Sequence, residues 1–359
     1  MVGPASEIAG QPQVEGQQPV EEAAQAADAI EFDPHVVGNL SDDGDSVGDA
    51  ESLRESTASL SSSILEYRDF HGRKYQSSKT TEYWAPTDEK HIEGNDIAHH
   101  IALLLLDEQL TLAPIPSHPQ QILDIGTGTG IWAIDMADQY PGAEVLGTDI
   151  SAVQPDWVPP NCIFQIDDAQ LDWTFKESFF DFVHIRYMYG GIDDWDKLYS
   201  QAYTHLKPGG WFENMEIDLE TRSENPKVSD DADHIFKKWC KLFWDAGDKI
   251  GRTFKIARDN QMEDLMKKTG FVDVVHKSWK VPIGAWAQDP KLKKIGAFNG
   301  HFIDQSLDGF AVFPIGEILG WTQEEVTVFV SQMRSAIKDP KSLPYYVIHA
   351  VCGRKPEDA

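Results

Sequence analysis

Three glycines and two aspartates give this 359-residue sequence its clearest chemical signal. Gly126, Gly128 and Gly130 stand at alternate positions, after the apolar run 121–125 and before the helix-like run 131–137. Glycine has no Cβ, so it permits positive φ angles and lets a ligand lie against bare backbone amides at the positive end of a helix. The pattern predicts a strand, a tight turn and a helix that together bind a small molecule with an anionic group.

The two aspartates indicate which small molecule this is. Asp149 ends a second apolar run, roughly 20 residues beyond the glycines, where nucleotide-binding α/β units place an acid that accepts from ribose hydroxyls. The dinucleotide fingerprint G-x-G-x-x-G would need glycine at position 131, where this chain has Ile131. Asp124 precedes the first glycine by two residues, a place where a carboxylate would repel pyrophosphate but suits an ammonium group. S-adenosylmethionine carries the groups that these residues would meet.

At this point the chain resembles a known class. The run from Asp124 to Gly130 matches D-x-G-x-G-x-G, the first motif of the class I S-adenosylmethionine-dependent methyltransferases, at every position. Further landmarks follow in the order of that class: an acid ending the second strand, an acidic turn after the third, an apolar fourth strand and a Pro-Gly-Gly turn before the fifth (Asp149, Ile166–Ala169, Phe180–Arg186 and Leu206–Trp211).

A narrower resemblance concerns fungal proteins. The stretches Gly126–Asp138 and Gln154–Asn161 are similar to the LaeA-like methyltransferases of filamentous fungi. That family includes nuclear regulators of metabolite clusters as well as enzymes that methylate the metabolites. The resemblance therefore determines the cofactor, S-adenosylmethionine, better than the methyl acceptor.

The resemblance implies an α/β fold with a doubly wound, mostly parallel, seven-stranded Rossmann-like sheet of strand order 3-2-1-4-5-7-6, an antiparallel last strand and helices on both faces. The sequence agrees, because strand-like and helix-like runs alternate from residue 121. Between the expected sixth strand at 271–275 and seventh at 345–351 lie about 70 residues, far more than a hairpin loop needs. We expect a helical insertion over about 283–340 that is able to cap the acceptor pocket.

The resemblance also implies roles for single residues. The three glycines would approach the methionine portion of S-adenosylmethionine, Asp124 would orient its ammonium group and Asp149 would hold its ribose. Asp168 and Ala169 would meet the adenine, with Asp167 as the next choice. No metal ion is implied.

The acceptor side offers weaker signals. His184, on the fourth strand, is the candidate base for a phenol, acid or amine acceptor. A lone strand histidine is more often a packed core residue or one that supports a neighbouring site residue, so those alternatives stay open. Some residues at the ends of the fourth and fifth strands, and one tryptophan of the insertion, could also line the pocket. The alternative is that the aromatic side chains among them lie in the core and the carboxylates lie on the surface or against a helix. These residues are Arg186, Tyr187, Tyr189, Trp211, Glu213, Glu216 and Trp286.

Composition predicts a tail and one large domain. Residues 1–60 hold 13 acids and one base, Arg54, with no Trp or Tyr, so they cannot bury enough apolar surface to fold. We expect a disordered acidic tail over 1–64 and a methyltransferase domain over 65–359. The tail carries −12 of the net charge of −28, which leaves −16 on the remainder. Nucleic acid is thus an unfavourable direct partner, because phosphate binding needs clustered Lys and Arg.

The remaining expectations concern location and partners. No stretch approaches the roughly 18 apolar residues that cross a bilayer, and the N-terminus has no signal-like run, so we expect an intracellular protein of the cytoplasm or nucleus. Cys162, Cys240 and Cys352 lie far apart without C-x-x-C spacing, which predicts buried thiols. Two functions fit the sequence: methylation of a small secondary metabolite at oxygen or nitrogen, or regulation of secondary metabolism in a complex with transcriptional protein partners.

Overall fold

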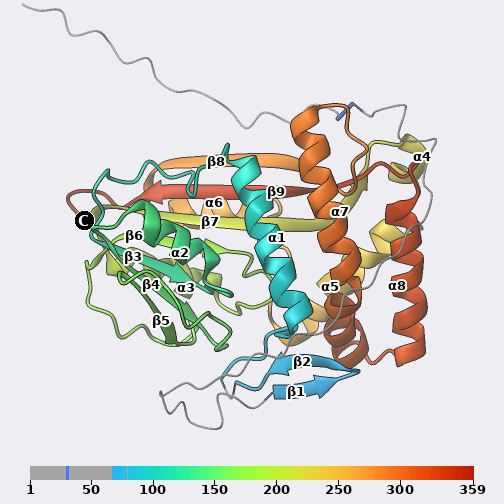
Figure 1. Cartoon of the computed structure of the whole chain (residues 1–359), viewed down its shortest axis with the longest axis horizontal. Coiled ribbons are helices and arrows are strands. Elements are labelled where there is room, and N and C mark those ends of the chain that lie inside the picture. Colours follow the sequence, from blue (N-terminus) through green and yellow to red (C-terminus); the bar gives the residue numbers. More distant parts are fainter. Residues whose placement is uncertain (1–29, 32–66, 79) are drawn as a thin grey trace, which may run out of the picture.

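A computed structural model describes residues 30–31, 67–78 and 80–359 (Figure 1). The tail expected over 1–64 lies outside these residues except for Ile30 and Glu31. Ile30 is buried against an apolar cluster that includes Trp286 and Tyr345, and the carbonyl of Glu31 accepts from the Gln288 N–H at 2.8 Å. At these two residues the chain is docked on the domain, where the sequence had predicted disorder.

The central sheet has seven strands in the order β5-β4-β3-β6-β7-β9-β8. The neighbours from β5 to β7 are parallel, and β9 runs antiparallel to both β7 and β8. Counted along the chain this order is 3-2-1-4-5-7-6, so the predicted topology is confirmed. The strands are β3 (Gln121–Ile125), β4 (Glu144–Asp149), β5 (Cys162–Ile166), β6 (Phe180–Arg186), β7 (Leu206–Ser223), β8 (Val272–Pro282) and β9 (Pro344–Arg354).

Helices cover both faces of this sheet, as Figure 1 shows. Successive residues of β3 point to opposite faces, so that Ile122 packs in a core with Trp132 of α2, whereas Leu123 belongs to the larger core that contains Tyr199 of α3. The helices before β8 are α1 (Glu89–Leu105), α2 (Ile131–Gln139), α3 (Trp195–His205), α4 (Pro226–Ser229), α5 (Ile235–Ile250) and α6 (Gln261–Thr269).

The predicted helical insertion before the last strand is also present. It consists of α7 (Pro290–Ala311), the π-helical turn η1 (Val312–Ile318) and α8 (Gln323–Lys338). A capping box begins α8, because the Thr322 hydroxyl accepts from the Glu325 N–H and the Glu325 carboxylate accepts from the Thr322 N–H. In Figure 1 these helices gather with α5 at one end of the sheet, and α7 lies along α1.

A short hairpin precedes α1 and fixes where that helix begins. It is formed by β1 (Tyr67–Phe70) and β2 (Arg73–Gln76). The Arg73 guanidinium donates twice to Asp88, over 2.5 and 2.8 Å, and Asp88 is the N-cap that accepts from the His91 N–H. The hairpin therefore holds the first turn of α1 in place.

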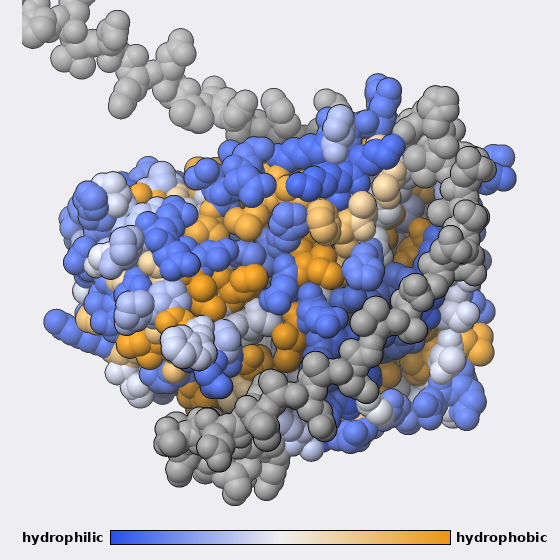
Figure 2. Space-filling model, in the orientation of Figure 1, coloured by the Kyte–Doolittle hydropathy of each residue, from blue (hydrophilic) through white to orange (hydrophobic). Residues whose placement is uncertain are grey.

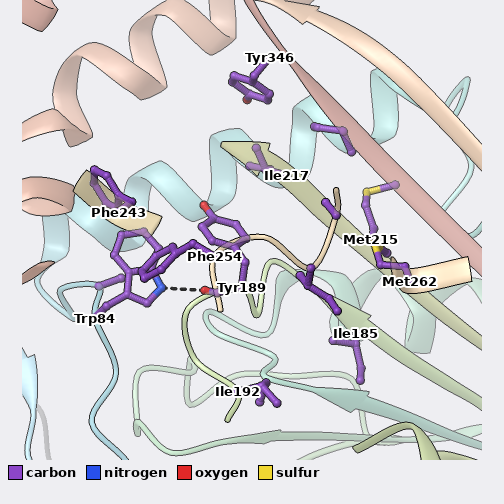
Figure 3. Packing of buried hydrophobic residues seen from close by; sticks show 14 of the residues in the cluster. Trp84, Ile185, Tyr189, Ile192, Met215, Ile217, Phe243, Phe254, Met262 and Tyr346 are labelled. Atoms are coloured by element: carbon purple, nitrogen blue, oxygen red, sulfur yellow. Dashed lines mark hydrogen bonds between the residues drawn. The ribbon is translucent and has the colours of Figure 1, made fainter. Parts of the chain in front are cut away.

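Aromatic packing fixes the chain beyond the end of β6 (Figure 3). The indole Nε1 of Trp84 donates to the carbonyl of Tyr189 at 2.9 Å. Phe243 and Phe254 contact the Trp84 ring edge to face, with centroids 6.1 and 5.3 Å away. The loop that follows β6 is thus held from the core side.

Candidate functional site

A cleft opens at the carboxyl ends of β3, β4, β5 and β6, where the order of the strands reverses. It encloses about 1180 Å³, counting the space open to solvent. Every residue that the sequence assigned to the cofactor except Gly130 lines it, and so does His184. These lining residues are Asp124, Gly126, Gly128, Asp149, Asp168 and Ala169, together with Asp167.

The three glycines have left-handed φ angles of 67°, 56° and 80°, but the space beside each is filled differently. A Cβ on Gly126 would stand 2.2 Å from Sδ of Met188, and one on Gly130 would stand 2.2 Å from the Phe164 ring. These two glycines make room for protein side chains. At Gly128 the nearest protein atom would be Nδ2 of Asn95, 3.8 Å away, so the open space there belongs to the cleft.

Asp124 stands at the centre of a buried polar group. Its Oδ1 lies 2.7 Å from Nδ1 of His184, and its Oδ2 accepts from the Thr127 hydroxyl at 2.6 Å. The imidazole of His184 stacks on Trp132 with the centroids 3.7 Å apart and the planes 7° from parallel. Burial lowers the pKa of His184 below its usual value, although the Asp124 carboxylate beside it raises this pKa.

Asp149 is tied to the glycine turn. Its carboxylate accepts from the backbone N–H groups of Gly128 at 2.9 Å and Ser151 at 2.8 Å. The expectation of bare amides in the turn is therefore wrong for Gly128, whose N–H already has a partner. Burial raises the pKa of the Asp149 carboxyl to about 6, while the hydrogen bonds from the two backbone N–H groups lower it.

The acidic turn after β5 is organised by a residue far upstream. The Thr81 hydroxyl donates to Oδ2 of Asp168 at 2.7 Å, and the N–H of Gln170 donates to its Oδ1 at 3.0 Å. The Asp168 N–H in turn donates to Oδ1 of Asp167 at 2.8 Å. One lone pair of each Asp168 oxygen is thus engaged, which leaves acceptor capacity toward the cleft.

Two buried carboxylates of β7 brace the cleft without lining it. Glu216 accepts from the N–H groups of Met188 and Tyr189 over 2.9 and 3.1 Å, which clamps the loop after β6. Burial raises the pKa of Glu216 to about 8 and that of Glu213 to about 7. Oε2 of Glu213 accepts from two N–H groups of the segment between α1 and β3, at 2.7 and 2.6 Å. Neither carboxylate is the surface or helix-contacting group that the sequence allowed.

The remaining candidate residues for the acceptor pocket fall into two groups. Arg186 and Tyr187 line the cleft, whereas Tyr189, Trp211 and Trp286 are buried in the cores. No residue of 283–340 lines the cleft, so the insertion does not supply the expected cap. All three cysteines are free and buried, as predicted.

The wall that the insertion was expected to supply comes from the segment before α1 and from the first turns of α1. Its members are Thr81, Tyr83, Pro86, Thr87, His91, Ile92, Asn95 and Ala98. Burial, and next the charge of Arg73, lower the pKa of His91 to about 4, so the ring is neutral at pH 7. The helical spacing of Ile97, Ile101, Leu104 and Leu105 predicts a helix beside the cofactor cleft, and α1 confirms it. Nothing in the sequence indicated that residues 81–87, before this helix, would also line the cleft.

Within the described ranges, no cluster of three or more His, Cys, Asp or Glu side chains is arranged to hold a metal ion. None of the helices described is long and apolar enough to cross a membrane. On the face seen in Figure 2, hydrophilic side chains surround smaller groups of apolar ones.

The strand order, the glycine turn after the first strand of the sheet and the acid at the end of the second define a class I methyltransferase. Comparison with known proteins agrees: residues 97–277 match the family model described as "Methyltransferase domain". The chain is 38% identical over 280 residues to methyltransferase pytC of Aspergillus terreus, covering 78% of this chain and 85% of that protein.

Two further relatives carry LaeA names. Over 293 residues the chain is 35% identical to the secondary metabolism regulator LAE1 of Cochliobolus heterostrophus, covering 80% of this chain and 94% of that protein. It is 29% identical over 293 residues, or 81% of this chain and 77% of the relative, to the protein-methionine methyltransferase laeA of Emericella nidulans. The chain belongs to the class I S-adenosylmethionine-dependent methyltransferases and, within them, to the fungal LaeA-like family.

Proposed function

We propose that this enzyme transfers the methyl group of S-adenosylmethionine to an oxygen or nitrogen atom of a small secondary metabolite. The observation that carries the proposal is the cleft itself, which continues from the glycine turn to a wall of aromatic and neutral side chains that includes Tyr83, His91 and Tyr187. A walled cleft suits a small acceptor better than an extended protein surface. The identity with a methyltransferase, pytC, over most of both chains supports the same conclusion.

In this proposal the residues at the carboxyl ends of β3, β4 and β5 would hold the cofactor. The glycine turn would hold its methionine portion and Asp124 its ammonium group. Asp149 would accept from the ribose hydroxyls, and Asp168 and Ala169 would hold the adenine. The bond from Thr81 to Asp168 supports the adenine assignment, because it fixes the carboxylate in one orientation at the cleft wall.

The protein aligns the acceptor with the methyl group, and alignment alone can lower the barrier by about 7–11 kcal/mol. An acceptor with an O–H or N–H group must also lose a proton. We propose His91 as the base, because its ring lines the cleft and no hydrogen bond joins its ring nitrogens to a described residue. The sequence had proposed His184, whose Nδ1 is engaged with Asp124, so we assign His184 the orientation of that carboxylate instead.

The experiment incubates the full chain with methyl-labelled S-adenosylmethionine and an extract of its source cells, and then separates organic-soluble label from protein-bound label. Organic-soluble label is expected, and Gly128→Ala serves as the control with weakened cofactor binding. Label on protein alone would contradict the metabolite proposal.

The second candidate is a regulator of secondary metabolism that acts in a complex with transcriptional protein partners. The observation in its favour is the similarity to LAE1, which extends over 94% of that protein. Removal of residues 1–64 separates the two candidates: small-molecule methylation that continues unchanged without the tail would count against regulation as the whole function.

A further inference from the structure

The cleft carries an uneven set of charges. Among the described residues that line it, four are carboxylates, Asp124, Asp149, Asp167 and Asp168, and Arg186 is the sole lysine or arginine. S-adenosylmethionine brings an ammonium group and a sulfonium, which suit the acids, and also one carboxylate. A carboxylate taken from water into a partly buried site requires a cationic or multiple hydrogen-bonding partner.

Arg186 lies beside the methionine end of the proposed cofactor site. It ends β6, whose residues pair with β3 in the register Asp124 with His184 and Ile125 with Ile185. The residues that follow this register on the two strands are Gly126 and Arg186, and both line the cleft. The guanidinium carbon of Arg186 lies 5.5 Å from the centroid of the Tyr187 ring, which also lines the cleft.

A relay of two side chains holds the guanidinium in this place. One Nη of Arg186 lies 2.9 Å from Nδ1 of His99 on α1, and Nε2 of His99 lies 2.9 Å from Oδ2 of Asp135 on α2. Arginine only donates, so Nδ1 must be the acceptor and the proton of the neutral ring must stand on Nε2, facing Asp135. Burial, the largest influence, lowers the pKa of His99, which agrees with a neutral ring.

The helix that carries His99, α1, lies beside the glycine turn. Asn95, one helical turn earlier, places its Nδ2 3.8 Å from the position of a Cβ on Gly128, and Asp96 accepts from the Thr129 hydroxyl at 3.0 Å. The remaining donors of Arg186 form no hydrogen bond with any described residue. They are therefore available to a ligand that lies on the glycine turn.

We propose that Arg186 binds the carboxylate of the cofactor and that His99, supported by Asp135, is the residue that positions it. Asp124 and Arg186 then receive the two opposite charges of the amino acid portion. Neither the motif D-x-G-x-G-x-G nor the acid of the second strand assigns this role. The inference rests on the proposed cofactor site and is independent of the acceptor.

The test compares two ligands by titration calorimetry on the full chain: S-adenosylmethionine and its decarboxylated form, which keeps the sulfonium and ammonium groups and lacks only the carboxylate. The wild-type chain should bind the decarboxylated form about 10- to 150-fold more weakly, the ratio expected for a hydrogen bond between charged groups. Arg186→Gln should bind the two ligands with equal affinity. Arg334→Gln, a substitution on α8 away from the cleft, should behave as wild type.

His99 is tested by a rescue. His99→Leu should weaken S-adenosylmethionine binding about 2- to 13-fold and leave the decarboxylated ligand unaffected. His99→Gln keeps both an acceptor and a donor and should restore most of the affinity, which a merely structural role would not explain. His99 is buried, so near-ultraviolet circular dichroism checks that each variant folds.

The outcomes separate this inference from the cofactor site on which it rests. If Arg186→Gln loses affinity equally for both ligands, or for neither, Arg186 does not bind the carboxylate and the inference fails. If Arg186 instead binds a carboxylate of the acceptor, Arg186→Gln should lose affinity for neither ligand. If the wild-type chain binds neither ligand, the cofactor site itself is wrong.

Discussion

Gly128→Ala tests whether the cofactor rests on the glycine turn. Gly128 has a φ of 56°, and a Cβ added there would have only one protein neighbour, Nδ2 of Asn95 at 3.8 Å. The methyl group would thus project into the cleft. The other two glycines of the turn cannot serve, because their Cβ atoms would displace Met188 and Phe164.

Two separate effects are expected. A left-handed φ costs an alanine roughly 1–2 kcal/mol, which lowers the melting temperature by a few degrees. A methyl group forced into contact with a bound ligand costs about 1–3 kcal/mol, equivalent to an S-adenosylmethionine affinity about 5- to 150-fold lower. The first effect belongs to the free protein and the second to the complex.

Gly320→Ala is the matched control. Gly320 has a φ of 80° and no atom within 4 Å of its added Cβ, and it lies between η1 and α8, outside the cleft. Both variants should lose similar thermal stability, and only Gly128→Ala should lose affinity in titration calorimetry. An affinity of Gly128→Ala within twofold of that of Gly320→Ala would refute the placement of the cofactor on this turn.

Three further predictions concern titratable groups. Burial raises the pKa of Asp149 to about 6, and the ribose hydroxyls need its ionised form as acceptor. Affinity for S-adenosylmethionine should therefore fall about tenfold from pH 7 to pH 5. Asp149→Asn should weaken binding and abolish this pH dependence, whereas a wild-type affinity that does not change with pH would contradict the role. Burial raises the pKa of Glu213 to about 7 in the folded chain, so the stability of the wild-type chain falls as pH rises from about 5 to 7. Glu213→Gln can keep both backbone hydrogen bonds and has no carboxyl group to ionise. In urea unfolding, the stability of this variant relative to wild type should rise by up to about 1.4 kcal/mol per pH unit in that interval and stay constant above it. His91→Gln should lower the yield of organic-soluble labelled product about 10²- to 10⁴-fold at unchanged cofactor affinity, and a parallel loss of affinity would show that His91 does not act on the acceptor.

The sequence by itself determined the sheet and the cofactor end of the cleft. Strands and turns of this kind depend on local patterns: apolar runs set β3 and β4, and the glycines permit left-handed φ angles that no other residue adopts as easily. Asp124 and Asp149 could be located because each stands at a fixed distance from those glycines in the sequence.

Tertiary structure decided the partners of these residues and the other wall of the cleft. The bond between His184 and Asp124 joins residues 60 positions apart, and that between Arg186 and His99 joins residues 87 apart. Long-range packing likewise sent the insertion to one end of the sheet and left Tyr83 and His91 to line the cleft. Such contacts depend on how helices and strands dock, which no spacing along a single chain records.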